Sequence, residues 1–264
     1  MVLNESNYYG EEAGREFMSV SQFKNFQKCE AAALAEIRGE YVPERGRALL
    51  LGSYVDEALT GTEESFSWFC GENYCELFKR NGDPYADVAQ ADEAIACVKR
   101  QPLMLKYLGG EHQTILTGEI EGVPIKGKFD SYKSGEFIAD LKYLKDFRSP
   151  NFFENAISYY GYDMQLAVYR ELAKQNGGGD LPCYLVIVTK QTPPDVAVAE
   201  VNEFDLDTAL LKFKANVGRY QAIKKGEIQP ERCESHDCPY CRATKVLTEP
   251  IDSSLLGRSK KDLE

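Results

Sequence analysis

Two aspartates and a lysine stand close together near the middle of the chain. Asp130 closes the sequence GKFD, and Asp140 and Lys142 are the ends of the sequence DLK. Residues two apart in a strand share a face, so Asp140 and Lys142 are expected to point the same way. The two carboxylates and the main-chain carbonyl of Leu141 suit Mg²⁺, which prefers oxygen ligands. The nearby ammonium group would orient a water or stabilise negative charge, as phosphodiester cleavage requires.

A simpler interpretation of these residues is a surface hairpin with a solvated Asp–Lys pair. The residues that follow favour the catalytic interpretation. Gln165 and Tyr169 are four residues apart and so share a helix face, and Tyr162 extends that face by one turn. A row of polar and aromatic side chains on one helix face belongs partly to the hydrophobic core in many helices. Beside a metal site, such a row could instead hold a DNA backbone.

The elements that must position these residues alternate between helices and strands. Ser19 with Gln22 predicts a capping box, Asp205 an N-cap, and Gly226 a helix end. Hydrophobic periodicity predicts helices over 19–38, 45–59, 90–100, 151–175 and 205–225, and strands over 115–120, 123–132, 136–143, 183–190 and 196–201. The strands from 115 to 143 would form a meander. This order predicts one mixed α/β domain over residues 1–245, with a helical N-terminal part and a flexible tail over 246–264.

The order of these motifs resembles the motif series of a known nuclease group. GKFD, then DLK, then Gln165-x-x-x-Tyr169 is similar to the RecB-like branch of the PD-(D/E)xK nucleases, which includes exonucleases of the exonuclease VIII (RecE) kind. The resemblance implies an α/β fold with a restriction-endonuclease-like core, a central mixed β-sheet flanked by helices. It also implies catalytic roles for Asp130, Asp140, Lys142, Gln165 and Tyr169.

An upstream helix in that branch carries a Gly-x-x-x-His element. Here Gly52 is followed by Asp56, so a carboxylate stands where the family has histidine. The resemblance therefore implies that Asp56, Asp130 and Asp140 are the metal ligands. Glu57 is a substitute for Asp56, and Glu119 could support the site from a neighbouring strand.

The activity implied by this resemblance is Mg²⁺- or Mn²⁺-dependent exonuclease cleavage of linear DNA, either duplex or single-stranded. Phage-type members work beside a single-strand annealing recombinase in recombination, and several form homo-oligomers. A hypothesis from another class is a catalytically idle DNA-binding or assembly module on the same scaffold. The complete set of Asp130, Asp140 and Lys142 argues against that hypothesis.

A second group of chemically active residues consists of cysteines. Cys233, Cys238 and Cys241 follow the nuclease motifs, and Cys29 precedes them. This order resembles nucleases of the AddB and CRISPR-adaptation types, which implies a [4Fe–4S] cluster and an alternative function as a single-strand nuclease. Zn²⁺, in a site that His236 could complete with the three C-terminal cysteines, is the second interpretation, and ordinary reduced thiols are the third. The other cysteines, Cys70, Cys75, Cys97 and Cys183, are expected at core or surface positions.

Composition limits the classes of function. The chain has 264 residues and a net charge of −11, which argues against a protein that coats nucleic acid. A local basic patch is nevertheless expected around the acidic pair, at Lys126, Lys128, Lys142, Lys145 and Arg148; scattered solvated lysines are the alternative. The eight cysteines do not indicate a disulfide framework, and no membrane span or secretory signal is seen, so we expect a cytoplasmic protein.

Other features are expected to be structural. His112 should lie in a loop, and Trp68 with Phe66 and Phe69 should belong to the core. The chain has two histidines and no Walker-type glycine loop, so a histidine-based hydrolase or an ATPase is not indicated.

Overall fold

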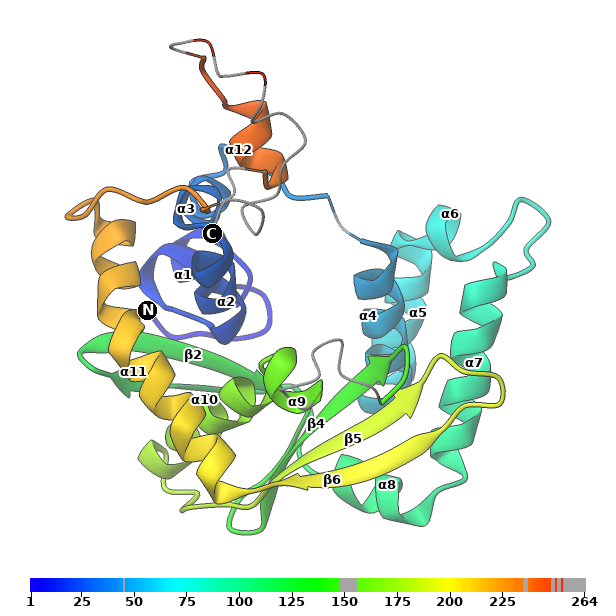
Figure 1. The fold of residues 1–264 in the computed structure, drawn as a ribbon. Coiled ribbons are helices and arrows are strands. Elements are labelled where there is room, and N and C mark those ends of the chain that lie inside the picture. Colours follow the sequence, from blue (N-terminus) through cyan, green and yellow to red (C-terminus); the bar gives the residue numbers. More distant parts are fainter. Residues whose placement is uncertain (45, 148–155, 235–236, 248–249, 251–252, 254–264) are drawn as a thin grey trace.

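Two β-sheets lie at the centre of the computed structural model, which describes residues 1–264 except 45, 148–155, 235–236, 248–249, 251–252 and 254–264 (Figure 1). The larger sheet has the order β3-β4-β5-β6, in which β4 and β5 are parallel and the outer pairs are antiparallel. Its strands are β3 (Ser131–Lys133), β4 (Phe137–Leu144), β5 (Cys183–Thr189) and β6 (Val196–Val201). Strands β1 (Thr114–Ile120) and β2 (Val123–Phe129) form a separate antiparallel pair. The predicted mixed sheet is confirmed.

The predicted meander over 115–143 is wrong, because the strand over 123–132 breaks at Asp130. Strand β2 pairs with β1, whereas β3 pairs with β4 in the other sheet. At the break, the carboxylate of Asp130 accepts a hydrogen bond from the N–H of Leu141, 2.9 Å away. A side chain bonded to the backbone in this way replaces strand pairing locally.

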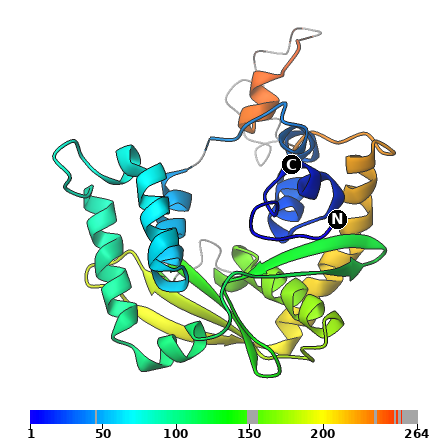
Figure 2. The same cartoon turned by 180° about the vertical axis from the view of Figure 1, so that it is seen from behind.

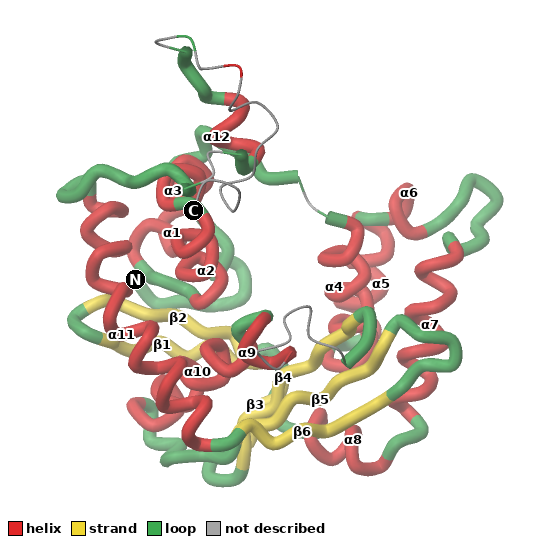
Figure 3. The backbone as a smooth tube through the Cα atoms, in the orientation of Figure 1, coloured by secondary structure: helices red, strands yellow, loops and turns green. Residues whose placement is uncertain are grey.

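The helices divide between the two faces of the larger sheet (Figures 2 and 3). Helices α4, α7 and α8 contact strands β4 and β5 from one side, and α10 with α11 packs on the other side. The helices on the first side and their neighbours are α4 (Arg47–Thr60), α5 (Glu63–Glu72), α6 (Tyr74–Leu77), α7 (Ala86–Lys99) and α8 (Pro102–Leu108). The others are α1 (Glu11–Glu16), α2 (Val20–Lys28), α3 (Glu30–Ile37), α9 (Ala156–Tyr159), α10 (Tyr162–Gln175), α11 (Glu203–Lys225) and α12 (Pro239–Ala243).

Strand β4 separates two hydrophobic cores. Its side chains alternate between faces, so Ile138 packs in the core of α10 and α11, whereas Ala139 and Leu141 pack in the core of α4 and α7. Asp140 and Lys142 follow the period of Ile138 and therefore face α10. The alternation thus places the two charged residues opposite the helix that carries Gln165 and Tyr169.

Several predicted helix boundaries change. The helix over 19–38 is two helices, because Cys29 is extended with φ −165° between α2 and α3. Ser19 caps α2 through the N–H of Gln22, but the Gln22 side chain donates to the carbonyl of Gly14, so the capping box is half formed. Helix α11 begins earlier than predicted and is capped by Asn202 instead of Asp205.

Other predictions are resolved as follows. The helix over 151–175 is confirmed as α10 only from Tyr162, after the short α9, and residues 151–155 lie outside the described part of the chain. Gly226 ends α11 in the left-handed conformation with φ +78°, as predicted. His112 lies in a turn, as predicted. Most of the predicted tail over 246–264 lies outside the described residues.

The prediction of a core role is wrong for Trp68, whose surface is 69% exposed on α5. Phe66 and Phe69 on the same helix are half-buried against the core of α4 and α7, as predicted. Among the described residues, no helix is both long enough and apolar enough to cross a membrane.

Helix α10 lies very close to the β1–β2 pair because two strand positions are glycine. A Cβ at Gly118 would lie 2.3 Å from the Gln175 side chain and 2.8 Å from that of Leu172. Gln175 cannot easily withdraw, because its amide bonds both the N–H and the carbonyl of Glu119. A Cβ at Gly127 would lie 3.0 Å from the ring of Tyr169. The close approach of α10 therefore depends on these glycines.

We predict that Gly118→Ala destabilises the fold by about 1–3 kcal/mol, the usual cost of overpacking. Gly218→Ala is the matched control, since a Cβ on that helical glycine meets nothing within 4 Å. The control should stabilise the chain by about 0.5–1 kcal/mol through helix propensity. Urea unfolding followed by circular dichroism measures both changes, and equal effects of the two substitutions would contradict the close packing of α10.

Candidate active site and cysteine centre

Asp140 is the most enclosed of the predicted catalytic residues. It lies on β4 with 1% of its side chain exposed, and it forms an ion pair with the ammonium group of Lys142 on the same strand. Its second oxygen accepts a hydrogen bond from Nε2 of Gln165 on α10, at 2.8 Å. Burying a carboxylate is costly unless it is paired and hydrogen-bonded, and both partners come from residues that the spacing predicted.

Asp130 occupies the break between β2 and β3 and is anchored to β4. Its Oδ2 accepts the N–H of Leu141, so the carboxylate is fixed one residue away from Asp140 along the sheet. Burial raises the pKa of Asp130 well above its usual range, and the charges of Asp140 and Asp56 raise it further. Lys142 and the Leu141 N–H act in the opposite direction without cancelling the shift.

Asp56 comes from α4, on the opposite side of the sheet from α10. Its two oxygens accept hydrogen bonds from Oγ1 of Thr60 at 3.0 Å and from Nε2 of Gln113 at 3.3 Å. Burial raises the pKa of Asp56, and the carboxylate of Asp140 raises it as well. The structure therefore brings the three predicted metal ligands into one electrostatically linked group.

The two supporting carboxylates named from the sequence differ in their relation to this group. The charge of Glu57 adds to the rise in the pKa of Asp56, while its Oε2 accepts a hydrogen bond from Ser65 at the start of α5. Glu119 is exposed and lies five residues beyond Thr114, which pairs with Phe129 beside the site. Five residues of strand span about 17 Å, so the prediction that Glu119 supports the site is wrong.

Gln165 and Tyr169 face the strands and are mostly enclosed. The hydroxyl of Tyr169 donates to the carbonyl of Lys128 at 2.8 Å, and its ring stacks on Phe129 with centroids 4.3 Å apart. Gln165 donates to both Asp140 and the Tyr169 hydroxyl. Tyr169 is 7% exposed, so it holds the sheet in position and does not offer a surface to DNA.

Lys142 carries its positive charge inside the site. Burial acts to lower its pKa, but the carboxylates of Asp140 and Asp130 outweigh burial and raise it. Its Nζ also lies 5.1 Å from the centroid of the Tyr162 ring. A protonated lysine in this position can stabilise negative charge that develops on a phosphate.

Sequence reasoning did not identify three residues that contact Asp56 or Asp130. Thr60 lies one helical turn after Asp56, and that spacing could have indicated it. Gln113 and His112 come from the turn before β1, where Nδ1 of His112 lies 3.0 Å from the carbonyl of Asp130. Nothing in the sequence places that turn beside α4, so only the fold reveals these contacts.

The predicted basic patch is only partly present. Lys126 is buried at 4% exposure, with its Nζ 4.6 Å from the centroid of the Tyr8 ring, and burial lowers its pKa to about 8. Lys142 is occupied by its ion pair, and Arg148 lies outside the described residues. Lys128 packs over the ring of Tyr9, which leaves Lys145 as the exposed member of the set.

The three carboxylates fit a hydrated divalent cation. The charge of Asp140 raises the pKa of both Asp56 and Asp130, and a cation would relieve that repulsion. Among the described residues, these three carboxylates do not form a group close enough to hold an ion by direct bonds alone. Mg²⁺ keeps several water ligands and is commonly held by one or two carboxylates, so tight convergence is not required.

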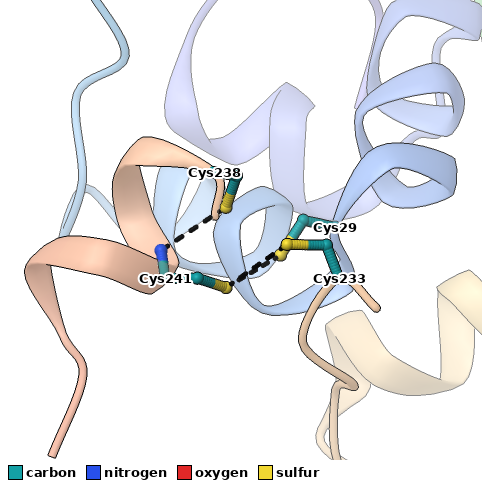
Figure 4. A group of neighbouring side chains, drawn as sticks. All are labelled: Cys29, Cys233, Cys238 and Cys241. Atoms are coloured by element: carbon teal, nitrogen blue, oxygen red, sulfur yellow. Dashed lines mark hydrogen bonds between the residues drawn. The ribbon is translucent and has the colours of Figure 1, made fainter. Parts of the chain in front are cut away.

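A second centre joins the two ends of the chain (Figure 4). The sulfur atoms of Cys29, Cys233, Cys238 and Cys241 all lie within 4.8 Å of one another. The Sγ of Cys241 lies 3.6 Å from that of Cys29 and 3.7 Å from that of Cys233. Cys238 caps α12, since its Sγ accepts the N–H of Cys241 at 3.4 Å. The structure thus brings the four predicted cysteines together, whereas His236 lies outside the described residues.

The four sulfurs are arranged as a ligand set. Burial raises the pKa of Cys241 to about 12, and hydrogen bonds shared with Cys238, Cys29 and Cys233 add to the shift. Four thiols in mutual contact compete for protons, and a bound cation replaces those protons by drawing the sulfurs into the thiolate form. The remaining cysteines behave as expected: Cys183 is buried, Cys70 and Cys97 are half-buried, and Cys75 is exposed.

The fold and site define a PD-(D/E)xK-type nuclease domain with a restriction-endonuclease-like core. Residues 19–244 match the family described as "PDDEXK-like domain of unknown function (DUF3799)", and the chain belongs to this family. A crystal structure of a "putative exonuclease" from Eubacterium rectale is 37% identical in sequence, with a TM-score of 0.89, and the match covers 100% of this chain and 98% of that one. No curated protein matches the chain significantly.

We predict that Asp130→Asn stabilises the chain in EDTA at pH 8. The folded-state pKa of Asp130 is raised, so its ionised form costs stability above that pKa, and the cost disappears as the pH falls through it. Asparagine removes the charge and can still accept the Leu141 N–H. The melting temperature should rise by about 2–4 °C, as about 1 kcal/mol produces in a chain of this size.

Added Mn²⁺ should raise the melting temperature of the wild type but not that of Asp130→Asn. Asp180→Asn is the surface control, since that carboxylate is 66% exposed. This variant should have the melting temperature of the wild type in EDTA and the same rise with Mn²⁺. A wild type more stable than Asp130→Asn in EDTA would contradict the electrostatic description of the site.

Proposed function

We propose that this chain is an exonuclease that hydrolyses phosphodiester bonds of linear DNA with Mg²⁺ or Mn²⁺. The observation that carries the proposal is the network in which Asp140 pairs with Lys142, accepts from Gln165, and lies beside Asp130. The name given to the E. rectale protein supports an exonuclease activity. The RecE-like motif order supports a setting in phage or prophage recombination, with a single-strand annealing recombinase as partner and a homo-oligomer as the working form.

In this proposal each residue has a separate task. Asp56, Asp130 and Asp140 would hold the divalent cation, with the Leu141 carbonyl as a further predicted ligand. When bound, such an ion lowers the pKa of a water and offsets phosphate charge. Lys142 stabilises negative charge on the scissile phosphate, because it stays protonated between two carboxylates. Gln165 orients Asp140, and Tyr169 fixes Gln165 against the strands.

A catalytically idle DNA-binding module is the competing interpretation. A scaffold without catalysis has no need for a buried carboxylate beside a charged lysine, because apolar residues of similar volume are often as stable in that position. The retained Asp140–Lys142 pair therefore favours the enzyme.

We predict that Asp140→Asn lowers Mg²⁺-dependent degradation of blunt linear duplex by about a thousandfold or more. Asparagine keeps the shape of the side chain and an oxygen for Gln165, so the fold should stay intact by circular dichroism. The matched control is Asp207→Asn, a surface residue paired with Arg170, which should cut at the wild-type rate.

The assay should compare linear duplex, single-stranded and circular DNA, followed by release of labelled nucleotide. Cleavage of linear but not circular DNA is expected of an exonuclease. If the wild type degrades none of these DNAs with either Mg²⁺ or Mn²⁺, or if Asp140→Asn cuts as fast as the wild type, the proposed function fails.

We further propose that the four cysteines hold one zinc ion. A zinc ion with Zn–S bonds of about 2.3 Å at tetrahedral angles keeps its sulfurs about 3.8 Å apart. The separations of 3.6 and 3.7 Å at Cys241 agree with that value. In a [4Fe–4S] cluster each cysteine binds a different iron, so the sulfurs must stand farther apart around the cluster. The distances therefore favour zinc over the cluster that motif order first suggested.

We predict that elemental analysis finds about one zinc ion per chain. Protein purified without oxygen should show no absorbance band at about 400 nm, where an iron–sulfur cluster would absorb. Cys241→Ser should lose the metal and lower the melting temperature, because a structural metal contributes folding free energy. Cys97→Ser is the control and should keep the zinc. Stoichiometric iron and sulfide would show a cluster instead, and absence of both metals would show free thiols.

A further inference from the structure

A groove beside the active site contains lysines and tyrosines that have no task in the proposed chemistry. It lies between α2, α9, the start of α10, and α11, and it encloses roughly 530 Å³. Its lining includes Lys24, Lys28, Tyr159, Tyr160 and Lys212. On a chain with a net charge of −11, three lysines around one groove form a local site for a negatively charged ligand.

A row of tyrosine rings leads from this groove to the catalytic lysine. The rings of Tyr159 and Tyr160 meet edge to face with centroids 5.0 Å apart, and Tyr160 stacks on Tyr162 at 5.6 Å. The Tyr162 ring in turn lies 5.1 Å from Nζ of Lys142. Tyr159 and Tyr160 are 45% and 42% exposed, so their rings remain accessible to a ligand.

Lys24 is held in place within the groove wall. Its Nζ donates to the carbonyl of Tyr160 at 3.1 Å and lies 5.7 Å from the centroid of the Tyr162 ring. Gly161 makes this possible in two ways. Its φ of +64° suits glycine, and a Cβ there would lie 2.9 Å from Cε of Lys24.

The charges that surround the groove favour an anion. Lys28 on α2 and Lys212 on α11 are both exposed at its rim. The acidic lining residue is Asp163, which is buried and whose carboxylate accepts the N–H of Met164. The Asp163 carboxylate is therefore bonded to the backbone at the start of α10, while Lys28 and Lys212 remain available to the ligand.

We propose that this groove binds one strand of single-stranded DNA and leads it to the active site. Tyrosine rings can stack on bases of any sequence, and lysines at the rim can contact the phosphates. A duplex keeps its bases stacked on one another, so only an unpaired strand can use the exposed rings. The inference rests on the proposed nuclease function and names the form in which DNA reaches the site.

The test is binding of a fluorescein-labelled oligothymidylate measured by anisotropy in EDTA, where no cleavage occurs. The two groove variants are Lys28→Gln/Lys212→Gln and Tyr159→Leu/Tyr160→Leu. Each should raise the Kd about tenfold. The lysine variant should also reduce the salt dependence of log Kd by about 1.4, since each single-strand phosphate contact contributes about 0.7. The tyrosine variant should leave the salt dependence unchanged.

Two control variants test whether removing any exposed lysine or any exposed tyrosine weakens DNA binding, wherever the residue lies. Lys225→Gln removes an exposed lysine from the far end of α11, and Tyr74→Leu removes an exposed ring from α6. Both should bind as the wild type does, and circular dichroism should show that all variants are folded.

The groove proposal is overturned if both groove variants bind with the wild-type Kd, if the wild type does not bind the oligonucleotide, or if blunt duplex binds more tightly than the single strand. These outcomes are distinguishable from failure of the nuclease proposal. Groove variants that bind and cut normally refute the groove alone. Groove-dependent binding by a wild type that cuts no DNA refutes the nuclease alone.

Discussion

Three carboxylates that repel one another are held together inside this molecule, and much of the fold serves to keep them there. Asp56 comes from α4, Asp130 from the break between two strands, and Asp140 from the middle of β4. Each buried carboxylate oxygen needs a hydrogen-bond donor. The ammonium group of Lys142 and the main-chain N–H of Leu141 are two of these donors. The others are polar side chains on α4, on α10 and in the turn before β1. The excess negative charge that remains would favour a divalent cation at this position.

The position of β4 between two hydrophobic cores makes this arrangement possible. Its alternating side chains direct Ala139 and Leu141 to one core while Asp140 and Lys142 face α10. Helix α10 can approach because Gly118 and Gly127 leave room for it. The start of the same helix contributes Tyr162, which connects Lys142 with the row of tyrosines in the groove. The packing contacts, the proposed catalytic residues and the proposed strand groove thus share helix α10.

The part of the site that could be predicted from the sequence is the part fixed by local periodicity. Strand spacing placed Asp140 with Lys142, and helix spacing placed Gln165 with Tyr169. The position of Glu119 was predicted wrongly. The alternation of side chains shows which face of a strand a residue lies on, but it does not show how far along another sheet the strand extends. Gln113 was missed because its contact with Asp56 joins a turn to a helix 57 residues away. The break at Asp130 was missed because alternation continues through it, and only the bond to Leu141 marks it.

The central claim is that Asp56, Asp130 and Asp140 together bind a divalent metal ion. Anomalous diffraction from crystals grown with MnCl₂ tests it most directly, because the manganese signal locates the ion without reference to activity. We predict a manganese peak that contacts the carboxylates of Asp130 and Asp140 and faces the carboxylate of Asp56. The peak should be present in the wild type and absent from Asp140→Asn. A wild-type crystal with saturating Mn²⁺ and no peak between these carboxylates would contradict the account.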